Sequence, residues 1–541
     1  MVFAAAVLLY IPSVRHGFVQ DDRAIIASNP AVHSVGAALR AFDDSYWPRE
    51  SGAGLYRPVT ILTYAIDWAV SGGRPGWFHF INALWHGLAT LLLALIFARW
   101  LPALAAAGAA LVFAWHPVHV EAVASLVGRA ELLAACGILG AVLAARRGWW
   151  STAVVCAAVG MFSKEHGVIA GVVILLDQWL GPPSPEEPAL SAAKGRGGQG
   201  VRTPRAFWVA LSVVTAGYLV AWGLIGIAGA SAPAAVFFER DTWGRLAIAL
   251  PAVLRAAVLL VWPVSLSSDY SPQVIPAYTG LSLAAVLGFW IVVAVPALVV
   301  WCRRRAPAIA FAAAVGGLSF LPTSNLLFAG GIVLAERNLY LAVALPAAII
   351  GTGLAWMAHG YPLSRRERGT GGEDSVPERG NDRRSLVRAI VAGGLVVVVY
   401  GALAWARLPA WRDNRAQLLT LLVEHPESYL GHASAAAVLA GRGDTAGARH
   451  QYRVADSLFA GDPYLDAAHA IFLLGLGDTA AAEPLIARIR ARSRAATSRM
   501  ALRAQFLFDW RRGDRQAALT VADSARRRFP GEEIWYRAYL Q

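Results

Sequence analysis

The sequence has little charge for its length. Only 15% of its 541 residues are Asp, Glu, Lys or Arg, whereas 57% are hydrophobic, and the mean hydropathy is +0.49. A soluble protein of this composition would have to expose much of its apolar surface to water. Uncharged stretches such as 206–231 and 279–301 are long enough to cross a hydrocarbon core about 30 Å thick. The sequence therefore predicts an integral membrane protein.

Metal-ligating patterns are also scarce. The chain has 3 Cys residues, all within or at the ends of apolar stretches and none in a Cys-x-x-Cys pair, so neither a disulfide framework nor a thiolate metal site is predicted. The motif His-Glu-x-x-His is absent, and Pro117 interrupts regular helix between His116 and His119. We therefore expect no metal and no other cofactor.

The net charge of +13 lacks the clustering that nucleic-acid binding requires. Much of the excess lies in short connectors between apolar stretches, where the positive-inside rule places it. The residues after Trp411 contain 18 Arg and 14 acidic residues, which form a mixed solvated surface without a basic stripe. We expect no nucleic-acid partner.

Eleven apolar segments are interpreted as membrane spans, the first as a retained helix rather than a removed signal. If the basic connectors between them are cytoplasmic, the loop 15–77 and everything after residue 407 share the opposite face. The connectors are Arg99, 146–147, 194–205, 303–305 and 365–388. The expected spans are 2–14, 78–98, 101–116, 132–145, 150–162, 167–180, 206–231, 279–301, 306–324, 338–358 and 389–406.

One further segment tests this count. Residues 246–263 are apolar enough to span, but Arg255 lies in their middle, and a crossing there would move 303–305 to the outer face. We therefore expect this segment to be re-entrant or to lie at the membrane interface. The loops 181–205 and 359–388, rich in Gly, Pro, Ser and Arg, are expected to be flexible cytoplasmic connectors.

The C-terminal quarter has a different pattern. The dipeptide Gly-Asp recurs at Gly443, Gly477 and Gly513, at spacings of 34 and 36, each time with an Ala at the same later offset. This period is typical of tetratricopeptide repeats, whose stacked helix pairs form a concave surface for extended peptides. An irregular helical domain is the alternative. The predicted fold is all-α, with a polytopic bundle over 1–407 and a helical solenoid over 408–541.

Adjacent carboxylates, Asp21 and Asp22, follow the first span almost at once. Their mutual repulsion favours a raised pKa in one of them, which suits a general base. A sugar transfer to a hydroxyl group needs such a base to accept the acceptor's proton. The alternative is a helix-ending turn in which Arg23 is the partner of the acids.

Other ionisable residues lie at span ends, nearly all on the same expected face. Such groups have an energetic cost near a membrane, so they need partners or a function. The outer face is where a polyprenyl-phosphate sugar presents its head group; the departing phosphate needs cations and the hydroxyl needs a carboxylate. Arg129, Lys164 and Arg337 are the phosphate candidates, although Lys164 and Arg337 are also explained as structural partners of Glu165 and Glu336. The remaining candidates for sugar binding or positioning are Arg57, His79, His116, His119, Glu121, Glu131, Glu165, Asp269, Tyr270 and Glu336.

The order of seven motifs resembles the transmembrane and tetratricopeptide-repeat-containing O-mannosyltransferases and their bacterial relatives, in the GT-C superfamily. The motifs are DDRAI, YRPVT, FHFINALWH, HPVHVEAVASLVGRAE, SKEHG, LSSDYS and AERNLYL, between residues 16 and 345.

The resemblance implies a metal-independent, inverting transfer of mannose from dolichyl or undecaprenyl phosphate to Ser or Thr of a protein. It carries the catalytic carboxylate over to Asp21, with Asp22 as its neighbour and possible substitute, and loosely assigns Arg337 to the lipid phosphate. This chain has only three or four repeats, so the acceptor, whether protein or envelope glycan, stays open. The Ala, Arg and Gly bias suggests a bacterial inner membrane, with the active site and the repeats periplasmic.

Two other functions compete with glycosyl transfer. A membrane-anchored scaffold would use the repeats to bind a partner during envelope protein assembly, but eleven spans are excessive for an anchor. A transporter predicts ionisable residues near the bilayer midplane and duplicated halves, and the sequence shows neither. An Asp21→Asn substitution separates an enzyme from a scaffold, because a scaffold does not depend on that carboxylate.

Overall fold

The computed structural model is built from α-helices joined by loops and short 3-10 or π turns. It describes residues 1–48, 54–181, 203–226, 233–277, 280–359, 379–492 and 498–529. Within these ranges there is no β-strand, only an isolated bridge between Pro272 and Ile275. The predicted all-α fold is confirmed. Most of the loops 181–205 and 359–388, and the span ends at 227–231 and 279, lie outside the described residues.

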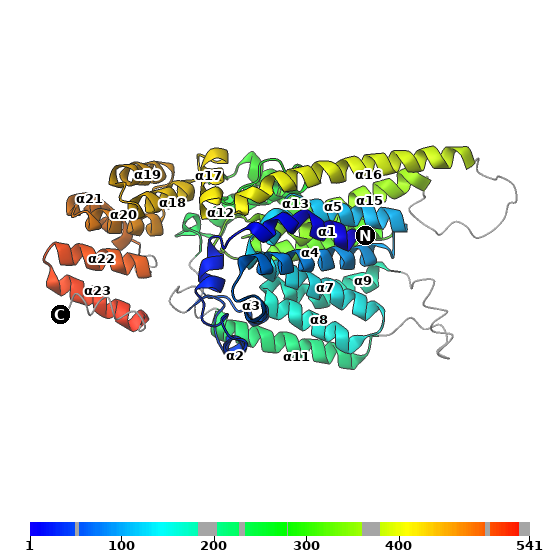
Figure 1. The fold of residues 1–541 in the computed structure, drawn as a ribbon, viewed down its shortest axis with the longest axis horizontal. Coiled ribbons are helices and arrows are strands. Elements are labelled where there is room, and N and C mark those ends of the chain that lie inside the picture. The colour runs from blue at the N-terminus through cyan, green and yellow to red at the C-terminus, as the bar shows by residue number, and fades with distance from the viewer. Residues whose placement is uncertain are drawn as a thin grey trace.

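The first 407 residues form a bundle of helices that run side by side (Figure 1). In the described part of the chain, 7 helical segments are long and apolar enough to cross a membrane, and shorter apolar helices accompany them. Each expected span falls on one bundle helix. These helices are α1 (Val2–Tyr10), α4 (Pro75–Phe97), α5 (Ala103–Trp115), α7 (Arg129–Arg146), α8 (Trp150–Ser163), α9 (Ala170–Leu180), α11 (Arg205–Ala221), α13 (Leu283–Cys302), α14 (Pro307–Phe320), α15 (Ala344–His359) and α16 (Arg379–Arg407).

Small residues let neighbouring helices approach closely in this bundle. A Cβ added to Gly137 of α7 would lie 2.6 Å from the Cα of Gly160 in α8, and a Cβ on Gly167 would lie 2.2 Å from the carbonyl carbon of Gly160. In a membrane, where apolar burial alone does not favour one helix pairing over another, such backbone contact supplies the packing energy. These glycines therefore hold α7 and α8 against the turn that carries Lys164 and Glu165.

The C-terminal residues form helical hairpins beyond one end of the bundle (Figure 1). Gly443, Gly477 and Gly513 lie in their turns with φ of 83°, 81° and 79°, a left-handed conformation that glycine adopts readily. The Asp after each Gly caps the next helix. The Gly-Asp spacing thus encodes three hairpins, while their assignment as tetratricopeptide repeats stays a prediction. The helices are α17 (Asn414–Glu424), α18 (Tyr429–Gly441), α19 (Thr445–Leu458), α20 (Pro463–Gly475), α21 (Thr479–Arg490), α22 (Arg499–Arg511) and α23 (Arg515–Arg528).

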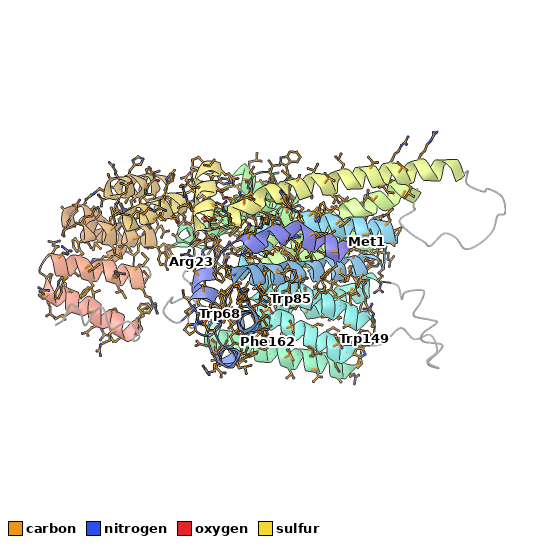
Figure 2. The ribbon with its side chains drawn as sticks, viewed as in Figure 1. Met1, Arg23, Trp68, Trp85, Trp149 and Phe162 are labelled. Carbon is orange, nitrogen blue, oxygen red and sulfur yellow. The ribbon has the colours of Figure 1, made fainter. Side chains whose placement is uncertain are left out.

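We call the bundle end that contacts the C-terminal hairpins the site end. The backbone N–H of Gly17 donates to the carbonyl oxygen of Arg412 at 2.9 Å, so the first loop and the start of the hairpins meet there. Figure 2 shows Arg23 and Trp68 at this end, and Met1 and Trp149 toward the opposite end. The loops of the site end contain α2 (Val35–Leu39), α3 (Pro58–Ser71), α6 (His119–Ala124), and the 3-10 helices η6 (Glu165–Ile169) and η10 (Glu336–Leu339).

The opposite end gathers basic connector residues. Arg99 and Arg146 both donate to the carboxylate of Asp177, and the Arg303 guanidinium lies 4.9 Å from the centre of the Trp179 ring. The structure thus separates these cations from the site end. Which compartment each end faces stays a prediction.

The segment expected to be re-entrant or interfacial forms one continuous helix, α12 (Thr242–Val261). By length and composition it is able to cross a membrane. Both of its ends, however, contact the site end: Arg245 donates to the carbonyl oxygen of Leu327, and the carbonyl oxygen of Leu260 bonds His116 Nε2 at 3.2 Å. Trp243 and Trp262, at the two ends, are largely exposed, as is typical of residues at a membrane interface. These contacts favour the interfacial alternative.

We predict that both ends of α12 are accessible from the same side of the membrane. In a chain without its native cysteines, Glu239→Cys and Val264→Cys should react with an impermeant maleimide from the side that labels Asp444→Cys. Arg304→Cys should react only from the other side. Labelling of Val264→Cys together with Arg304→Cys would show that α12 crosses the membrane.

Candidate functional site

The turn that carries Asp21 and Asp22 has an unusual backbone. Gln20, just before the pair, has a φ of 47°, in the left-handed region that residues other than glycine seldom adopt. The Asp22 side chain is fully buried, and its two oxygens accept N–H bonds from Val19 at 3.0 Å and Val127 at 2.9 Å. Asp22 is therefore held as an anchor that ties this turn to the loop between α6 and α7.

Asp21 has a different environment. Its side chain is half-buried, and among the described residues it has no hydrogen-bond or ion-pair partner. The sequence treats the two carboxylates as equivalent, but the structure separates them: one is bonded into the backbone and the other is available. Burial raises the pKa of Asp22 to about 7, against the effect of the backbone N–H groups, and repulsion from Asp21 adds only a smaller rise.

Arg337 lies within electrostatic range of this available carboxylate. Its guanidinium pairs with Glu121, and its backbone N–H donates to the other Glu121 oxygen at 2.9 Å. Burial acts to lower the pKa of Arg337, but the carboxylates of Glu121 and, next in size, Asp21 outweigh it, so that the pKa is raised. The Arg337 side chain is still 27% exposed. It is therefore a paired cation with an accessible surface next to Asp21.

Two more ion pairs adjoin Arg337. Arg57 donates to both oxygens of Glu165, at 3.0 and 2.9 Å, in the fork geometry of a strong pair. Lys164 pairs with Glu131 and donates to the side-chain oxygen of Asn338 at 3.3 Å. Burial lowers the pKa of Lys164, although Glu131 opposes this, whereas Arg57 outweighs burial and lowers the pKa of Glu165.

These residues form one group, which we call the polar cluster. Each of its three cations pairs with one acid, so that Asp21 is its only carboxylate without a partner among the described residues. The structure thus brings together residues that lie on five separate motifs of the sequence. The polar cluster consists of Asp21, Arg57, Glu121, Glu131, Lys164, Glu165 and Arg337.

Arg129 does not belong to the polar cluster. Its side chain is 0% exposed, and its guanidinium bonds Asp67, the side-chain oxygen of Asn82 at 2.7 Å and the carbonyl oxygen of Phe78 at 3.0 Å. With its donors occupied inside the protein, Arg129 is not placed to contact a phosphate. This geometry favours a structural role instead of the expected one. Asp67, a single acid in the otherwise apolar α3, was the sequence signal for this pair.

The expected histidines bond backbone carbonyl groups. Nε2 of His79 lies 3.3 Å from the oxygen of Gly17, and Nε2 of His119 lies 3.0 Å from the oxygen of Tyr340. His116 bonds α12 through Leu260, as described above. Burial lowers the pKa of His119, which keeps its ring neutral. Among the described residues, no three His, Cys, Asp or Glu side chains form a group able to hold a metal ion.

Asp269 and Tyr270 join three parts of the site end. Asp269 accepts a hydrogen bond from Ser428 of the hairpin region at 2.5 Å, while Tyr270 donates to Glu336 at 2.9 Å. Glu336 is fully buried, and burial raises its pKa. These residues were expected to line the substrate site, but their bonds link the hairpins to η10, which carries Arg337. No sequence pattern predicted the contribution of Ser428.

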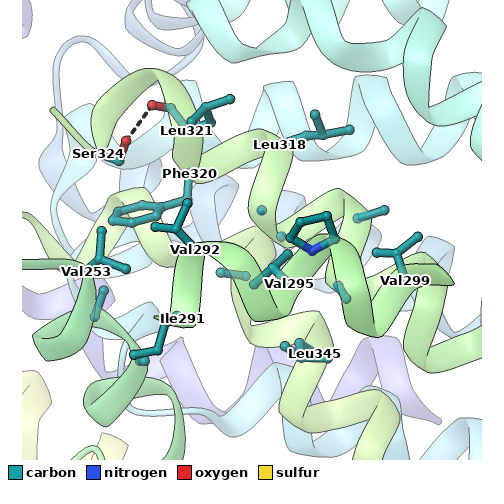
Figure 3. Close-up of a pocket in the computed structure, with 18 of the residues that line it drawn as sticks. Val253, Ile291, Val292, Val295, Val299, Leu318, Phe320, Leu321, Ser324 and Leu345 are labelled. Atoms are coloured by element: carbon teal, nitrogen blue, oxygen red, sulfur yellow. Dashed lines mark hydrogen bonds between the residues drawn. The ribbon is translucent and has the colours of Figure 1, made fainter. Parts of the chain in front are cut away.

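An apolar cavity of about 630 Å³ lies beside η10 (Figure 3). Its walls are mainly aliphatic side chains of α9, α12, α13 and α14. Leu339, two residues after Arg337, lines one part of it, and Trp179, near the opposite end of the bundle, lines another. Trp179 and Val300 are substantially exposed, so the cavity extends from Leu339 of η10 to the outer surface of the bundle.

The fold and the site together define a class: an integral membrane protein with a polar cluster at one end of its bundle, beside an apolar cavity. The comparisons with known proteins agree with this class. The chain is 28% identical to a protein O-mannosyl-transferase of Caenorhabditis elegans over 369 residues, which are 64% of this chain and 49% of that protein.

Two further relatives have the same designation. The chain is 26% identical to protein O-mannosyl-transferase TMTC4 of Mus musculus over 83% of this chain and 64% of that one. It is 34% identical to protein O-mannosyl-transferase Tmtc2 of Drosophila melanogaster over 32% of this chain and 20% of that one. The chain is a relative of these transferases, which confirms the resemblance. It spans about half the length of the worm protein.

No family model matches the chain, and no solved structure matches it.

We predict that Arg129 supports the fold. Arg129→Leu leaves the Asp67 carboxylate buried without its partner, which should lower the free energy of unfolding by about 3–5 kcal/mol. Adding Asp67→Leu should restore part of that loss, because no unpaired charge then remains. The thermal unfolding midpoint of each purified variant measures this. A single variant as stable as the native chain would contradict the structural role.

Proposed function

We propose that this protein is a membrane glycosyltransferase that transfers mannose from a polyprenyl-phosphate donor to a hydroxyl group, the Ser or Thr hydroxyl of a protein. The names of its relatives support the transferase class and the sugar. The observation that carries the proposal is the composition of the polar cluster: it contains three paired cations and one carboxylate, Asp21, that has no partner in the described structure and acts electrostatically on Arg337.

In the proposed reaction, the acceptor oxygen attacks the anomeric carbon of the sugar. Asp21 accepts the hydroxyl proton while the bond between that carbon and the phosphate oxygen breaks. The polyprenyl phosphate leaves with the bonding electron pair. Attack from the side opposite the leaving phosphate inverts the anomeric carbon, as the resemblance implies. Arg337 fits as the group that binds the leaving phosphate, because its guanidinium is partly exposed beside Asp21.

The other ion pairs of the polar cluster serve to position these groups. Lys164, paired with Glu131 and bonded to Asn338, fixes η10 next to Arg337. The pair of Arg57 and Glu165 closes the cluster on the side of α3. Such preorganised charges stabilise a developing phosphate charge without having to reorient during the reaction. A metal ion is not part of the proposal, because the protein's own cations face the leaving group.

The donor's lipid tail fits the apolar cavity. Its lining is aliphatic, and it begins next to η10, so a phosphate at Arg337 would place the first isoprene units near Leu339. We further propose that the hairpins hold the acceptor and that the site end faces the periplasm of a bacterial inner membrane. The shared position of the first loop and the hairpins supports a common reaction space.

Asp21→Asn should reduce mannose transfer by about 10²- to 10⁴-fold, because the amide cannot accept the hydroxyl proton. The measurement uses purified protein, radiolabelled polyprenyl-phosphate mannose and periplasmic extract. Asp43→Asn, an exposed acid on the same loop, should retain native transfer. Full transfer by Asp21→Asn would remove this carboxylate from the mechanism. Absence of transfer from the native protein would favour the scaffold alternative.

Filling the cavity should affect long-chain donors selectively. Val292 lines the cavity, whereas its neighbour Val293 does not and is exposed on the outside of α13. Val292→Trp should raise KM for a long-chain donor about tenfold, roughly the effect of burying two fewer methylene groups, and leave KM for a short-chain donor unchanged. Val293→Trp is the matched control. Equal effects on both donors would contradict a tail in this cavity.

A further inference from the structure

The turn that presents Asp21 is held from the C-terminal region. The backbone N–H of Gln20 donates to the side-chain oxygen of Asn414 at 2.7 Å, across 394 residues of sequence. Gly17, at the start of the same turn, bonds the carbonyl oxygen of Arg412. These two contacts come from the segment that follows α16, and they are separate from the Asp22 anchor.

The geometry of Gln20 explains why such a contact matters. A left-handed φ at a residue other than glycine costs about 1–3 kcal/mol and persists only when its surroundings hold it. Gln20 itself is exposed, so its side chain has no enclosing packing to do this. The described contact that acts directly on its backbone N–H is the one with Asn414.

Asn414 is itself rigidly placed. It is the first residue of α17, and the preceding Asp413 caps that helix through a bond from the Ala416 N–H at 2.8 Å. One turn later, Gln417 donates to the hydroxyl oxygen of Ser268 at 2.6 Å. The bonds of Gln417 to Ser268 and of Arg412 to Gly17 therefore fix α17 and the residues before it to the bundle, and Asn414 presents its side-chain oxygen from a fixed base.

We propose that Asn414 is a positioning residue for the transfer reaction: it holds Gln20 in the left-handed conformation and thereby directs the Asp21 carboxylate toward Arg337. This inference rests on the proposed function of Asp21. It adds that the first C-terminal helix is part of the catalytic end, although the sequence places it in a separate repeat region. In this proposal Asn414 acts on the reaction through the backbone of Gln20.

Removing the contact between Asn414 and Gln20 should slow the chemical step. Asn414→Ala should lower kcat about 10- to 100-fold, because a small displacement of a catalytic group has that effect, with KM for the donor unchanged. Asn414→Asp retains an acceptor oxygen of the same reach and should recover most of the native kcat. Arg415→Ala, at the exposed next position of α17, should behave as the native chain. An equal loss of kcat in Asn414→Ala and Asn414→Asp would overturn the proposal.

A second variant tests the backbone argument directly. Glycine adopts a left-handed φ without strain, so Gln20→Gly introduced into Asn414→Ala should restore part of kcat. If Asn414 only stabilised α17, a substitution at residue 20 would not restore kcat. No recovery in the double variant would therefore count against positioning.

Hydrogen–deuterium exchange of the full-length protein supplies a readout that does not depend on activity. Asn414→Ala should speed exchange in the peptide 16–24, and Arg415→Ala should not. Faster exchange with native kcat would overturn the positioning proposal. If Asp21→Asn retained full transfer, the proposed role of Asp21 as the base would be wrong. The exchange rate of the peptide 16–24 would still show whether Asn414 holds this turn.

Discussion

A charged group between apolar helices has to be paired, and the site end is organised around that requirement. Arg57, Lys164 and Arg337 each have a carboxylate partner, so the positive charge near the membrane is balanced locally. The pairing also joins α3, α6, α7 and η6 to η10. One carboxylate, Asp21, has no partner among the described residues, and it lies on a turn that is held both by Asp22 and by Asn414. The proposed role of Asp21 as the catalytic base follows from its lack of a partner.

The sequence was sufficient for the helices of the bundle and for the turns of the hairpins, because both depend on local properties. Apolar length identifies a span, and Gly-Asp followed by a small residue identifies a tight helical hairpin. Local properties did not predict whether α12 crosses the membrane or lies at its interface. Its composition suits either a crossing or an interfacial helix, and only contacts of Arg245 and Leu260 with distant segments distinguish the two.

The candidate site was predicted only in part, for a physical reason. Sequence patterns identified the polar residues, and the structure gathers seven of them. The sequence patterns did not distinguish the environment of Asp21 from that of Asp22. Val127, whose N–H bonds one oxygen of Asp22, lies 105 residues away in the sequence. The sequence analysis assigned Arg129 to a phosphate because the acceptors that Arg129 bonds inside the protein become visible only when α3 and α4 are placed beside it. Partners of this kind are a property of the packed chain.

The bonds of α17 and α18 to the loops of the site end have a consequence for acceptor choice. Asn414, Gln417 and Ser428 all bond residues of those loops. Helix α17 and the start of α18 therefore cannot swing as a tethered domain would. A polypeptide lying along the hairpins would therefore meet Asp21 at a fixed distance from its point of attachment. With a polypeptide acceptor, as proposed, such an arrangement would select a hydroxyl by its spacing from the bound segment, with little dependence on the residues around that hydroxyl.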